Sequence, residues 1–284
     1  MTDVSLRVGD LLREAASRLG RAGVAGPTQE ALRLWAGLRH ESPGAAYLAR
    51  DEAVEPERLA AFEAAVSRRE RGEPLAYVVG WTGFRHLVLR TDPRALIPRP
   101  ETEGLVEHVL LRVSSGRVAD VGTGSGCIAL SLATEGSYQR VVAVDASPAA
   151  LELARANAAE LGVDVAFVRG DLCAPLASGR FDAVVANPPY LSEAEYAVLD
   201  ASVRGWEPAM ALVSGPSGLD ATRRLLDEAR RVLRPAGWLA LEVDCRRARA
   251  VATEAERLGW DGVEVHEDLF GRARYVLARR SDAP

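Results

Sequence analysis

The chain has 284 residues, of which 48% are hydrophobic and 26% are charged. This composition is that of a globular protein with one or two domains, and it excludes global disorder. The formal net charge of −5 and the pI of about 5.6 disfavour a dedicated nucleic-acid binder, although local arginine clusters could still serve one. The first residues show no basic-then-apolar targeting pattern, and no apolar run is long enough to span a membrane.

The cysteines and histidines carry no metal or disulfide pattern. Cys127, Cys173 and Cys245 are far apart and form no CxxC pair, so we expect small buried hydrophobic side chains rather than disulfides, zinc ligands or reactive thiols. The four histidines show no metal-ligand spacing, so no metal site is expected. We therefore expect a cytoplasmic protein that has no metal and makes no membrane contact.

Residues 1–73 form a predicted helical domain. Apolar residues recur at helical spacing from Leu6 to Leu19, and glycines then end that helix. Thr28 is the expected N-cap of a second helix that runs to Leu38. A third is expected from about Pro56 through Val66. We expect this domain to have a packing role. The more specific alternative is that it docks the substrate.

Residues 74–100 change character and are interpreted as a β-hairpin and linker. Two short strands are expected at 77–81 and 86–90, around Thr82-Gly83-Phe84. The prolines of Ile97-Pro98-Arg99-Pro100 hold the following backbone extended. Glu101 or Thr102 is then expected to open a helix that runs to Leu111. The domain boundary is placed in this segment, before a third region at 101–284.

From residue 117 onward, strand patterns alternate with helix patterns. This alternation predicts an α/β fold: a Rossmann-like, doubly wound and mostly parallel sheet with helices on both faces. Ligands of such sheets bind beyond the carboxyl ends of the strands. The stretch 190–218 has little periodicity and is a candidate lid or substrate loop. Strands are expected at 117–121, 140–145, 164–168, 181–186, 237–243, 263–266 and 274–279, and helices at 125–134, 148–161, 220–233 and 246–258.

A glycine-rich turn follows the first of these strands. Its spacing differs from the dinucleotide fingerprint GxGxxG, whose third glycine would fall at Cys127, because here the third glycine comes one residue earlier. Asp120 stands two residues before the first glycine, where a carboxylate would repel a pyrophosphate but would suit the ammonium of a methionine moiety. The turn therefore predicts an S-adenosylmethionine site that includes Asp120, Gly122, Thr123, Gly124, Ser125 and Gly126.

Two further acids follow the next two strands. Asp145 could accept both hydroxyls of a ribose, and it could equally be a helix N-terminal acid before Ser147-Pro148. Asp171 could bond the adenine amino group, with the Leu172 backbone beside the ring, or could simply be a turn residue. Because acids follow three successive strands and one of them stands next to a glycine turn, a shared ligand site is a better interpretation than coincidence.

The segment Asn187-Pro188-Pro189-Tyr190 follows the buried strand at 181–186. An Asn amide followed by two residues without a backbone N–H makes a surface rich in acceptors and poor in donors, which suits a substrate NH2 group. The Asn187 side-chain oxygen and the Pro188 carbonyl could accept its two N–H bonds, and Tyr190 could stack on a flat substrate. The pattern predicts methyl transfer to a planar amine or amide nitrogen; an ordinary strand-terminating loop is the alternative.

At this point the chain resembles a known family, the HemK-type or PrmC-type release factor glutamine methyltransferases. The resemblance covers nearly the whole chain. Supporting segments are Asp145-Ala146-Ser147-Pro148, Glu207-Pro208 with Ala211-Leu212, and Asp268-Leu269 before Arg274. The most specific segments are Leu96-Ile97-Pro98-Arg99-Pro100-Glu101-Thr102-Glu103, Asp120 through Ile128, and Asn187-Pro188-Pro189-Tyr190.

The resemblance implies N5-methylation of the glutamine in the Gly-Gly-Gln loop of class 1 peptide release factors, by an enzyme expected to be a monomer. It implies cofactor contacts at Gly122 to Gly126, Asp145, Leu172 and Asn187, and a substrate clamp at Asn187 to Tyr190. It also implies that Arg99-Pro100-Glu101 lies near the mouth of the active site.

Two segments depart from the family pattern. Asp244-Cys245-Arg246-Arg247 stands where the family usually has a glycine and a glutamine, and Ser214 to Leu219 differs from the usual Asp-Gly-Leu. Neither overlaps the motifs assigned to chemistry, so these departures bear on packing or on partner contacts.

Three rival functions remain at this point. A DNA or RNA adenine N6-methyltransferase uses the same Asn-Pro-Pro-Tyr geometry on a flipped base, but the net negative charge and the small helical N-terminal domain weigh against it. A ribosomal-protein glutamine methyltransferase would differ mainly in its docking surface. A non-catalytic binding module is disfavoured by the intact glycine turn and Asn187.

Overall fold

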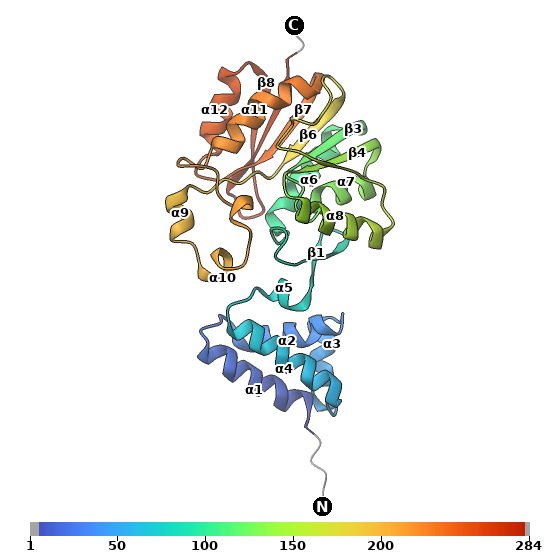
Figure 1. Ribbon diagram of the computed structural model, residues 1–284, viewed down its shortest axis with the longest axis vertical. Coiled ribbons are helices and arrows are strands. Elements are labelled where there is room, and N and C mark those ends of the chain that lie inside the picture. The colour runs from blue at the N-terminus through green and yellow to red at the C-terminus, as the bar shows by residue number, and fades with distance from the viewer. Residues whose placement is uncertain (1–5, 282–284) are drawn as a thin grey trace, which may run out of the picture. The chain divides into compact units, whose positions relative to one another are not determined.

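The computed structural model describes residues 6–281 and divides the chain into two compact units (Figure 1). The helical unit comprises the chain up to Trp81 together with Asp200–Trp206, and the sheet unit comprises Thr82–Leu199 and the chain from Glu207 onward. Among the described residues, no helix is both long and apolar enough to cross a membrane.

The helical unit packs around an apolar core that its amphipathic helices supply. α1 buries Val8, Leu11, Ala15 and Leu19 along one face, as the helical spacing predicted. The indole of Trp35 meets the ring of Phe62 edge-on, with the ring centroids 5.4 Å apart. The helices of this unit are α1 (Val8–Arg21), α2 (Pro27–Leu38), α3 (Pro43–Leu48), η1 (Ala49–Asp51), α4 (Pro56–Glu70), α5 (Leu75–Val79) and α10 (Ala201–Arg204).

Helix starts in this unit differ from the predictions. α2 begins at Pro27 after Gly26, which has left-handed backbone angles, so Thr28 is not the N-cap. α3 was not predicted, although Ser42 caps it by accepting a hydrogen bond from the Ala45 N–H and Pro43 occupies its first turn. The strand predicted at 77–81 is wrong over most of its length, because Leu75–Val79 is the helix α5.

The β-hairpin exists but is displaced from its predicted place. β1 (Trp81–Phe84) pairs with β2 (Leu87–Arg90), so the turn lies at Arg85 and His86 rather than at residues 82–84. Tyr77 and Val78 are buried on α5. Tertiary packing therefore outweighs the strand propensity of the aromatic and β-branched residues in this segment. Gly80, at φ 86°, ends α5 and lets the chain enter the hairpin.

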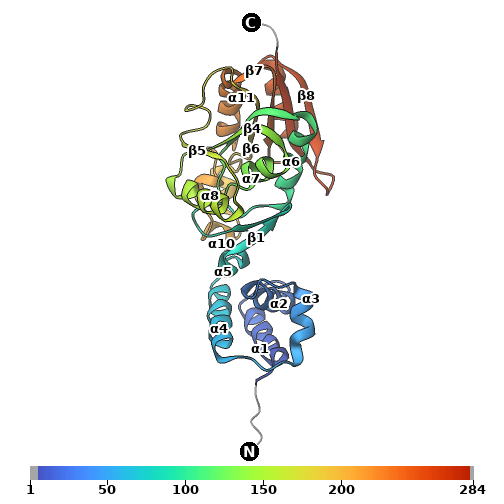
Figure 2. The same ribbon diagram turned by 90° about the vertical axis from the view of Figure 1, so that its right-hand side faces the viewer.

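The sheet unit is built on a seven-stranded sheet in the order β5-β4-β3-β6-β7-β9-β8 (Figure 2). Neighbouring strands from β5 to β7 are parallel, whereas β9 runs antiparallel to both β7 and β8. The predicted α/β class with a mostly parallel sheet is confirmed. The strands are β3 (Ser115–Val121), β4 (Ser137–Asp145), β5 (Ala166–Arg169), β6 (Phe181–Ala186), β7 (Leu233–Glu242), β8 (Trp260–Glu267) and β9 (Ala273–Arg280).

Helices cover both faces of this sheet (Figure 1). One buried apolar cluster joins the strands to α11 and α12, and another joins them to α6 and α7. β6 is buried at every position, as expected for a central parallel strand. The helices of this unit are α6 (Pro100–Arg112), α7 (Cys127–Glu135), α8 (Pro148–Leu161), α9 (Glu193–Ala197), η2 (Ala209–Ala211), α11 (Asp220–Val232) and α12 (Ala248–Arg257).

Most predicted elements of the sheet unit are confirmed with small shifts of their ends. β6 and α8 have the predicted bounds, whereas β7 begins at Leu233, four residues early. α6 begins at Pro100 with Arg99 as its N-cap, so neither Glu101 nor Thr102 opens it. The 190–218 stretch contains α9, α10 and η2, so it is not a structureless loop. Of the cysteines, Cys173 is buried, whereas Cys127 and Cys245 are only half-buried.

Helix α6 lies so close to β9 that only glycine fits at Gly104. A Cβ there would lie 2.4 Å from the hydroxyl of Tyr275, a buried residue whose hydroxyl donates to the Glu101 carbonyl. We expect Gly104→Ala to destabilise the protein, because overpacking costs about 1–3 kcal/mol of unfolding free energy. This cost exceeds the roughly 1 kcal/mol that alanine gains over glycine in a helix. Urea unfolding measures this change.

Gly44, in α3, is the matched control for that substitution. A Cβ there would meet only the Ser42 hydroxyl, at 3.8 Å, so Gly44→Ala is expected to be neutral or stabilising. Adding Tyr275→Phe to Gly104→Ala should recover part of the loss, because it removes the clashing oxygen. Equal stability of the two single alanine variants would contradict the overpacking account.

Candidate active site

The parallel register brings the ends of four strands to one rim of the sheet. Val121 on β3 is level with Val144 on β4 and with Ala186 on β6, and Ala186 is level with Leu241 on β7. The residues that follow these positions therefore surround one place. As the sequence predicted, the glycine turn, Asp145 and Asn187 are among them.

The glycine turn folds back over the end of β4. The backbone N–H groups of Gly122 and Thr123 both donate to the Val144 carbonyl, at 2.8 and 3.0 Å. Gly122, Gly124 and Gly126 all have positive φ, which favours glycine. At Gly126 a Cβ would also come within 3.1 Å of the Leu130 side chain. The three glycines are thus required by backbone conformation, and the last one also by close packing.

Asp120 lies beneath this turn and is fully buried. One carboxylate oxygen accepts hydrogen bonds from the Thr123 hydroxyl at 2.6 Å and from the Ala129 N–H at 3.1 Å. The other oxygen has no hydrogen-bond partner among the described residues. Burial raises the pKa of Asp120 to about 7. Asp120 therefore fixes the shape of the turn, and its second oxygen is a buried acceptor without a partner among the described residues.

Asp145 lines the cavity beside the turn and holds backbone on both sides of it. One carboxylate oxygen accepts from the Gly124 N–H and the other from the Ser147 N–H, each at 2.9 Å. Asp145 thus fixes the backbone at Ser147, the N-cap of α8, and each oxygen retains a further lone pair that a ribose hydroxyl could use. Asp171 also lines the cavity, but its side chain is 62% exposed and paired with Arg224 at 2.8 Å.

The cavity that these residues enclose has a volume of about 320 Å³. Asp145, Asp171, Leu172, Asn187, Pro189 and two of the turn glycines line it, so residues predicted from four separate segments meet there. The rest of the predicted set lies around the cavity without lining it: Asp120, Thr123, Ser125, Gly126, Pro188 and Tyr190. Pro188 is buried and Tyr190 is partly buried, and burial raises the pKa of the Tyr190 hydroxyl to about 12.

The side chain of Asn187 is oriented by two buried residues that sequence reasoning did not assign to the site. The Asn187 amide N–H donates to the Thr102 hydroxyl oxygen at 3.0 Å, and that hydroxyl donates to a Glu242 carboxylate oxygen at 2.7 Å. Thr102 and Glu242 are 2% and 1% exposed, so water does not compete for these bonds. Because one N–H of the amide nitrogen is held by Thr102, the nitrogen and oxygen of the Asn187 amide cannot exchange places, and the oxygen is left as an acceptor.

Glu242 ends β7 in an environment that disfavours its charged form. Burial raises its pKa to about 7, and the hydrogen bond from Thr102 and the charge of Arg274, with its guanidinium nitrogen 3.9 Å away, offset this only in part. The sequence did contain a signal for Glu242, because an acid stands at the end of a predicted buried strand. Thr102 gave no such signal, because only the fold brings α6 beside β6 and β7.

The family-specific segment around Arg99 is also held by a buried acid. Glu207 accepts from the Ile97 N–H at 3.1 Å and pairs with the Arg99 guanidinium. Leu96 and Pro208, next to these residues, line the cavity. Glu207 therefore joins two segments about a hundred residues apart at the cavity wall.

The two segments that depart from the family pattern lie behind Tyr190. Arg246 and Arg247 each bind both Asp244 and Glu195 of α9, with the Glu195 contacts at 2.7 Å. Gly218 has positive φ, and a Cβ there would lie 2.5 Å from the Tyr190 carbonyl. The 244–247 segment therefore forms an ion-pair cluster that supports α9, and Gly218 makes a close contact with the Tyr190 backbone. Both are packing roles.

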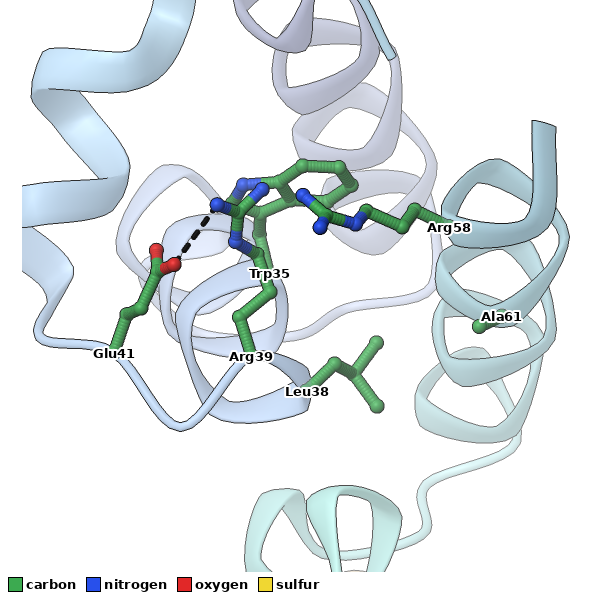
Figure 3. Close-up of a pocket in the computed structure, with 6 residues that line it drawn as sticks. All are labelled: Trp35, Leu38, Arg39, Glu41, Arg58 and Ala61. Carbon is green, nitrogen blue, oxygen red and sulfur yellow. Dashed lines mark hydrogen bonds and ion pairs between the residues drawn. The ribbon is translucent and has the colours of Figure 1, made fainter. Parts of the chain in front are cut away.

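A second cavity, of about 260 Å³, lies within the helical unit. Trp35 and Leu38 of α2 face Arg58 and Ala61 of α4 across it, and Figure 3 shows the Arg39 guanidinium against the Trp35 indole. Arg39 also pairs with Glu41 at 2.8 Å. No residue that the sequence analysis assigned to chemistry lines this cavity, so it is not part of the site described above.

The raised pKa of Glu242 predicts a pH dependence of stability. Between the ordinary value of 4.5 and about 7, the folded state keeps a proton that the unfolded state releases, so rising pH destabilises the folded protein over this window and no further above it. Glu242→Gln lacks this titration. We expect the variant's unfolding free energy, relative to the unaltered protein, to rise from pH 4.5 to about 7 and then to level off.

Urea unfolding of both proteins at a series of pH values measures this difference. Asp120, whose pKa is raised, contributes in the same sense, and His108, whose pKa burial lowers to about 4, contributes in the opposite sense. Both are present in the two proteins and cancel in the comparison. A difference that does not change with pH would contradict the assignment of a titrating Glu242.

Comparisons with known proteins identify the family of the chain. The PrmC N-terminal domain family matches residues 10–80, and the Methyltransferase small domain family matches residues 100–205. The release factor glutamine methyltransferase of Deinococcus radiodurans is 44% identical over 97% of this chain and 99% of its own length. That of Nitratidesulfovibrio vulgaris is 42% identical over 95% of this chain and 94% of its own length.

A solved structure shows the same fold. The crystal structure of a methyltransferase from Pyrococcus furiosus matches with a TM-score of 0.55 over 80% of this chain and 100% of that chain, at 19% identity. The resemblance stated from the sequence motifs is confirmed by these relatives. The chain belongs to the release factor glutamine methyltransferase family.

Proposed function

We propose that this protein transfers a methyl group from S-adenosylmethionine to the side-chain amide nitrogen of the glutamine in the Gly-Gly-Gln motif of class 1 peptide release factors. The observation that carries the proposal is the fixed Asn187 amide, whose N–H is committed to Thr102 and whose oxygen is therefore an acceptor at the cavity rim. Membership of the release factor glutamine methyltransferase family supports the same substrate.

The residues present fit S-adenosylmethionine. The buried Asp120 oxygen without a partner suits the ammonium of the methionine moiety, and the glycines of the turn leave the backbone open at the cavity. Asp145 has spare lone pairs for the ribose hydroxyls, and Leu172 offers an apolar wall for the adenine. When bound, the cofactor would supply an electrophilic methyl group on a sulfonium and would leave as S-adenosylhomocysteine. The amide nitrogen, which gains the methyl group, would lose one proton to solvent.

The role of Asn187 follows from the weak nucleophilicity of an amide nitrogen, whose lone pair is delocalised into the carbonyl. The resonance is strong, as the rotation barrier of about 18–20 kcal/mol in peptides indicates. The Asn187 oxygen and the Pro188 carbonyl accept the two N–H bonds of the glutamine amide, hold its nitrogen toward the methyl group and favour the positive charge that develops there. Tyr190 stacks on the flat amide.

Thr102 and Glu242 strengthen that role. When Glu242 is ionised, it can only accept, so Thr102 must donate to it and must accept from the Asn187 N–H. Hydrogen bonds in such a chain polarise one another, which makes the Asn187 oxygen a better acceptor for the substrate N–H. The chain also prevents the Asn187 amide from turning its donor toward the substrate.

We assign the remaining features accordingly. Residues 1–73 serve as a substrate-docking domain, the hairpin segment at 74–100 as its linker, and residues 101–284 as the catalytic domain. The enzyme acts as a monomer in the cytoplasm, where release factors work, and forms no stable complex with nucleic acid. The net charge of −5 supports the last assignment.

Mass spectrometry of an unmethylated release factor, incubated with this protein and S-adenosylmethionine, tests the function. We expect one methyl group on the Gly-Gly-Gln glutamine. Asn187→Ala should lower kcat by about 10²–10³-fold, as the loss of one group that stabilises transition-state charge does in other enzymes. Thr102→Val, which keeps the side-chain shape but removes the relay, should lower kcat by roughly 10–100-fold.

Controls separate chemistry from folding in that experiment. Both variants should keep a thermal midpoint close to that of the unaltered protein, and Thr102→Val, which does not line the cavity, should also keep its affinity for S-adenosylmethionine within about threefold. Unmodified release factor after incubation with cofactor-bound enzyme would overturn the proposal, and methylation of a ribosomal-protein glutamine or of adenine in its place would identify the actual substrate.

The cofactor assignment predicts unequal roles for two acids that line the same cavity. Asp145→Asn should weaken S-adenosylmethionine binding by about 10–100-fold, because it removes a charge-assisted acceptor beside the turn. Asp171→Asn should change binding by less than about threefold, because Asp171 is largely exposed and paired with Arg224. Isothermal titration calorimetry measures both. Equal losses in the two variants would contradict the assignment.

A further inference from the structure

Two large apolar side chains project into solvent from the turn between β8 and β9. Leu269 is 99% exposed and Phe270 is 72% exposed. Figure 2 shows this turn as the free end of the β8–β9 pair at the edge of the sheet. A single exposed hydrophobic residue is ordinary, but two adjacent ones of this size at a turn require an explanation.

The turn is held rigidly in the conformation that exposes them. The buried Asp268 carboxylate accepts from the backbone N–H groups of Phe270 and Arg272, at 2.9 and 3.0 Å. It also accepts from the guanidinium groups of Arg272 and Arg274, at 3.1 and 3.0 Å. The Asp268 N–H donates in turn to the Arg272 carbonyl at 2.8 Å, which closes the loop. Leu269 and Phe270 are therefore presented by a built turn.

The turn is connected to the candidate active site by direct contacts. Arg272 pairs with Glu101 at 3.3 Å, and Glu101 precedes Thr102, which binds Asn187. Arg274, which binds Asp268, lies 3.9 Å from Glu242 at the other end of the relay. Leu269 and Phe270 therefore lie at the same rim of the sheet unit as Asn187, the residue proposed to bind the acceptor amide.

We propose that Leu269 and Phe270 form an apolar docking tip that packs against the surface of the protein carrying the acceptor glutamine. The inference rests on the proposed function. A free amino acid or small amide could not cover both side chains while its amide reached Asn187, whereas a folded protein surface can. Covering large apolar side chains removes them from water, which makes these two residues effective anchors.

A rigid tip also has an advantage over a flexible one. The hydrogen bonds of Asp268 fix the backbone before the partner arrives, so less conformational entropy is lost on binding. The guanidinium of Arg272 lies 5.1 Å from the Phe270 ring centroid and so holds the ring from one side. The partner surface that fits is accordingly apolar where it covers Leu269 and Phe270.

Steady-state kinetics with a folded release factor test this proposal. The double variant Leu269→Ser, Phe270→Ser should raise KM for the release factor by at least about tenfold and leave kcat and KM for S-adenosylmethionine within about twofold. Leu269→Met, Phe270→Leu should retain near-normal KM, because it keeps the apolar surface. Leu111→Ser is the matched control, since Leu111 is 72% exposed at the far end of α6, and it should change nothing.

The outcomes separate this inference from the proposed function. If the unaltered enzyme leaves the release factor unmethylated, the proposed function fails. If it methylates the release factor and the serine double variant shows an unchanged KM, the proposed function stands and the docking tip is overturned. A rise in KM that Leu111→Ser reproduces would indicate a general effect of surface polarity and would also overturn it. Thermal unfolding of each variant checks that the turn itself remains folded.

Discussion

A buried carboxylate at the end of β7 organises the candidate active site. Glu242 accepts from Thr102, and Thr102 accepts from Asn187, so three residues from β7, α6 and the segment after β6 are joined by two hydrogen bonds. Burying an acid is costly, as its raised pKa of about 7 records. The cost is consistent with a role in orienting an amide that, left to itself, could present either its donor or its acceptor.

The same constraint explains the packing of α6. Thr102 reaches Glu242 only if α6 lies close against the sheet, and Gly104 permits that approach because a Cβ would clash with Tyr275. Tyr275 in turn binds the carbonyl of Glu101, and Glu101 pairs with Arg272 of the β8–β9 turn. The orientation of Asn187, the position of α6 and the exposed apolar turn are therefore parts of one contact network.

Buried or partly buried acids hold the backbone segments around the cavity in place. Asp120 shapes the glycine turn, Asp145 ties that turn to the start of α8, and Glu207 holds the Ile97-Arg99 segment. Each accepts at least one backbone N–H, so each positions main chain rather than only a neighbouring side chain. The departures from the family pattern act similarly, because Asp244 and Glu195 are bridged by two arginines behind Tyr190.

The alternation of strands and helices, the glycine turn with its acid, and the Asn187-Pro188-Pro189-Tyr190 segment were all predictable, because they follow from periodicity, backbone restriction and local chemistry. Parallel strand order then made it predictable that Asp145 and Asn187 would share a rim. The helical conformation of Tyr77 and the orientation of Asn187 by Thr102 and Glu242 were not predictable, because each depends on contacts between segments far apart in the chain. The exposure of Leu269 and Phe270 was likewise decided by the bonds of Asp268, since an apolar pair in a sequence does not reveal which side chains the fold leaves uncovered.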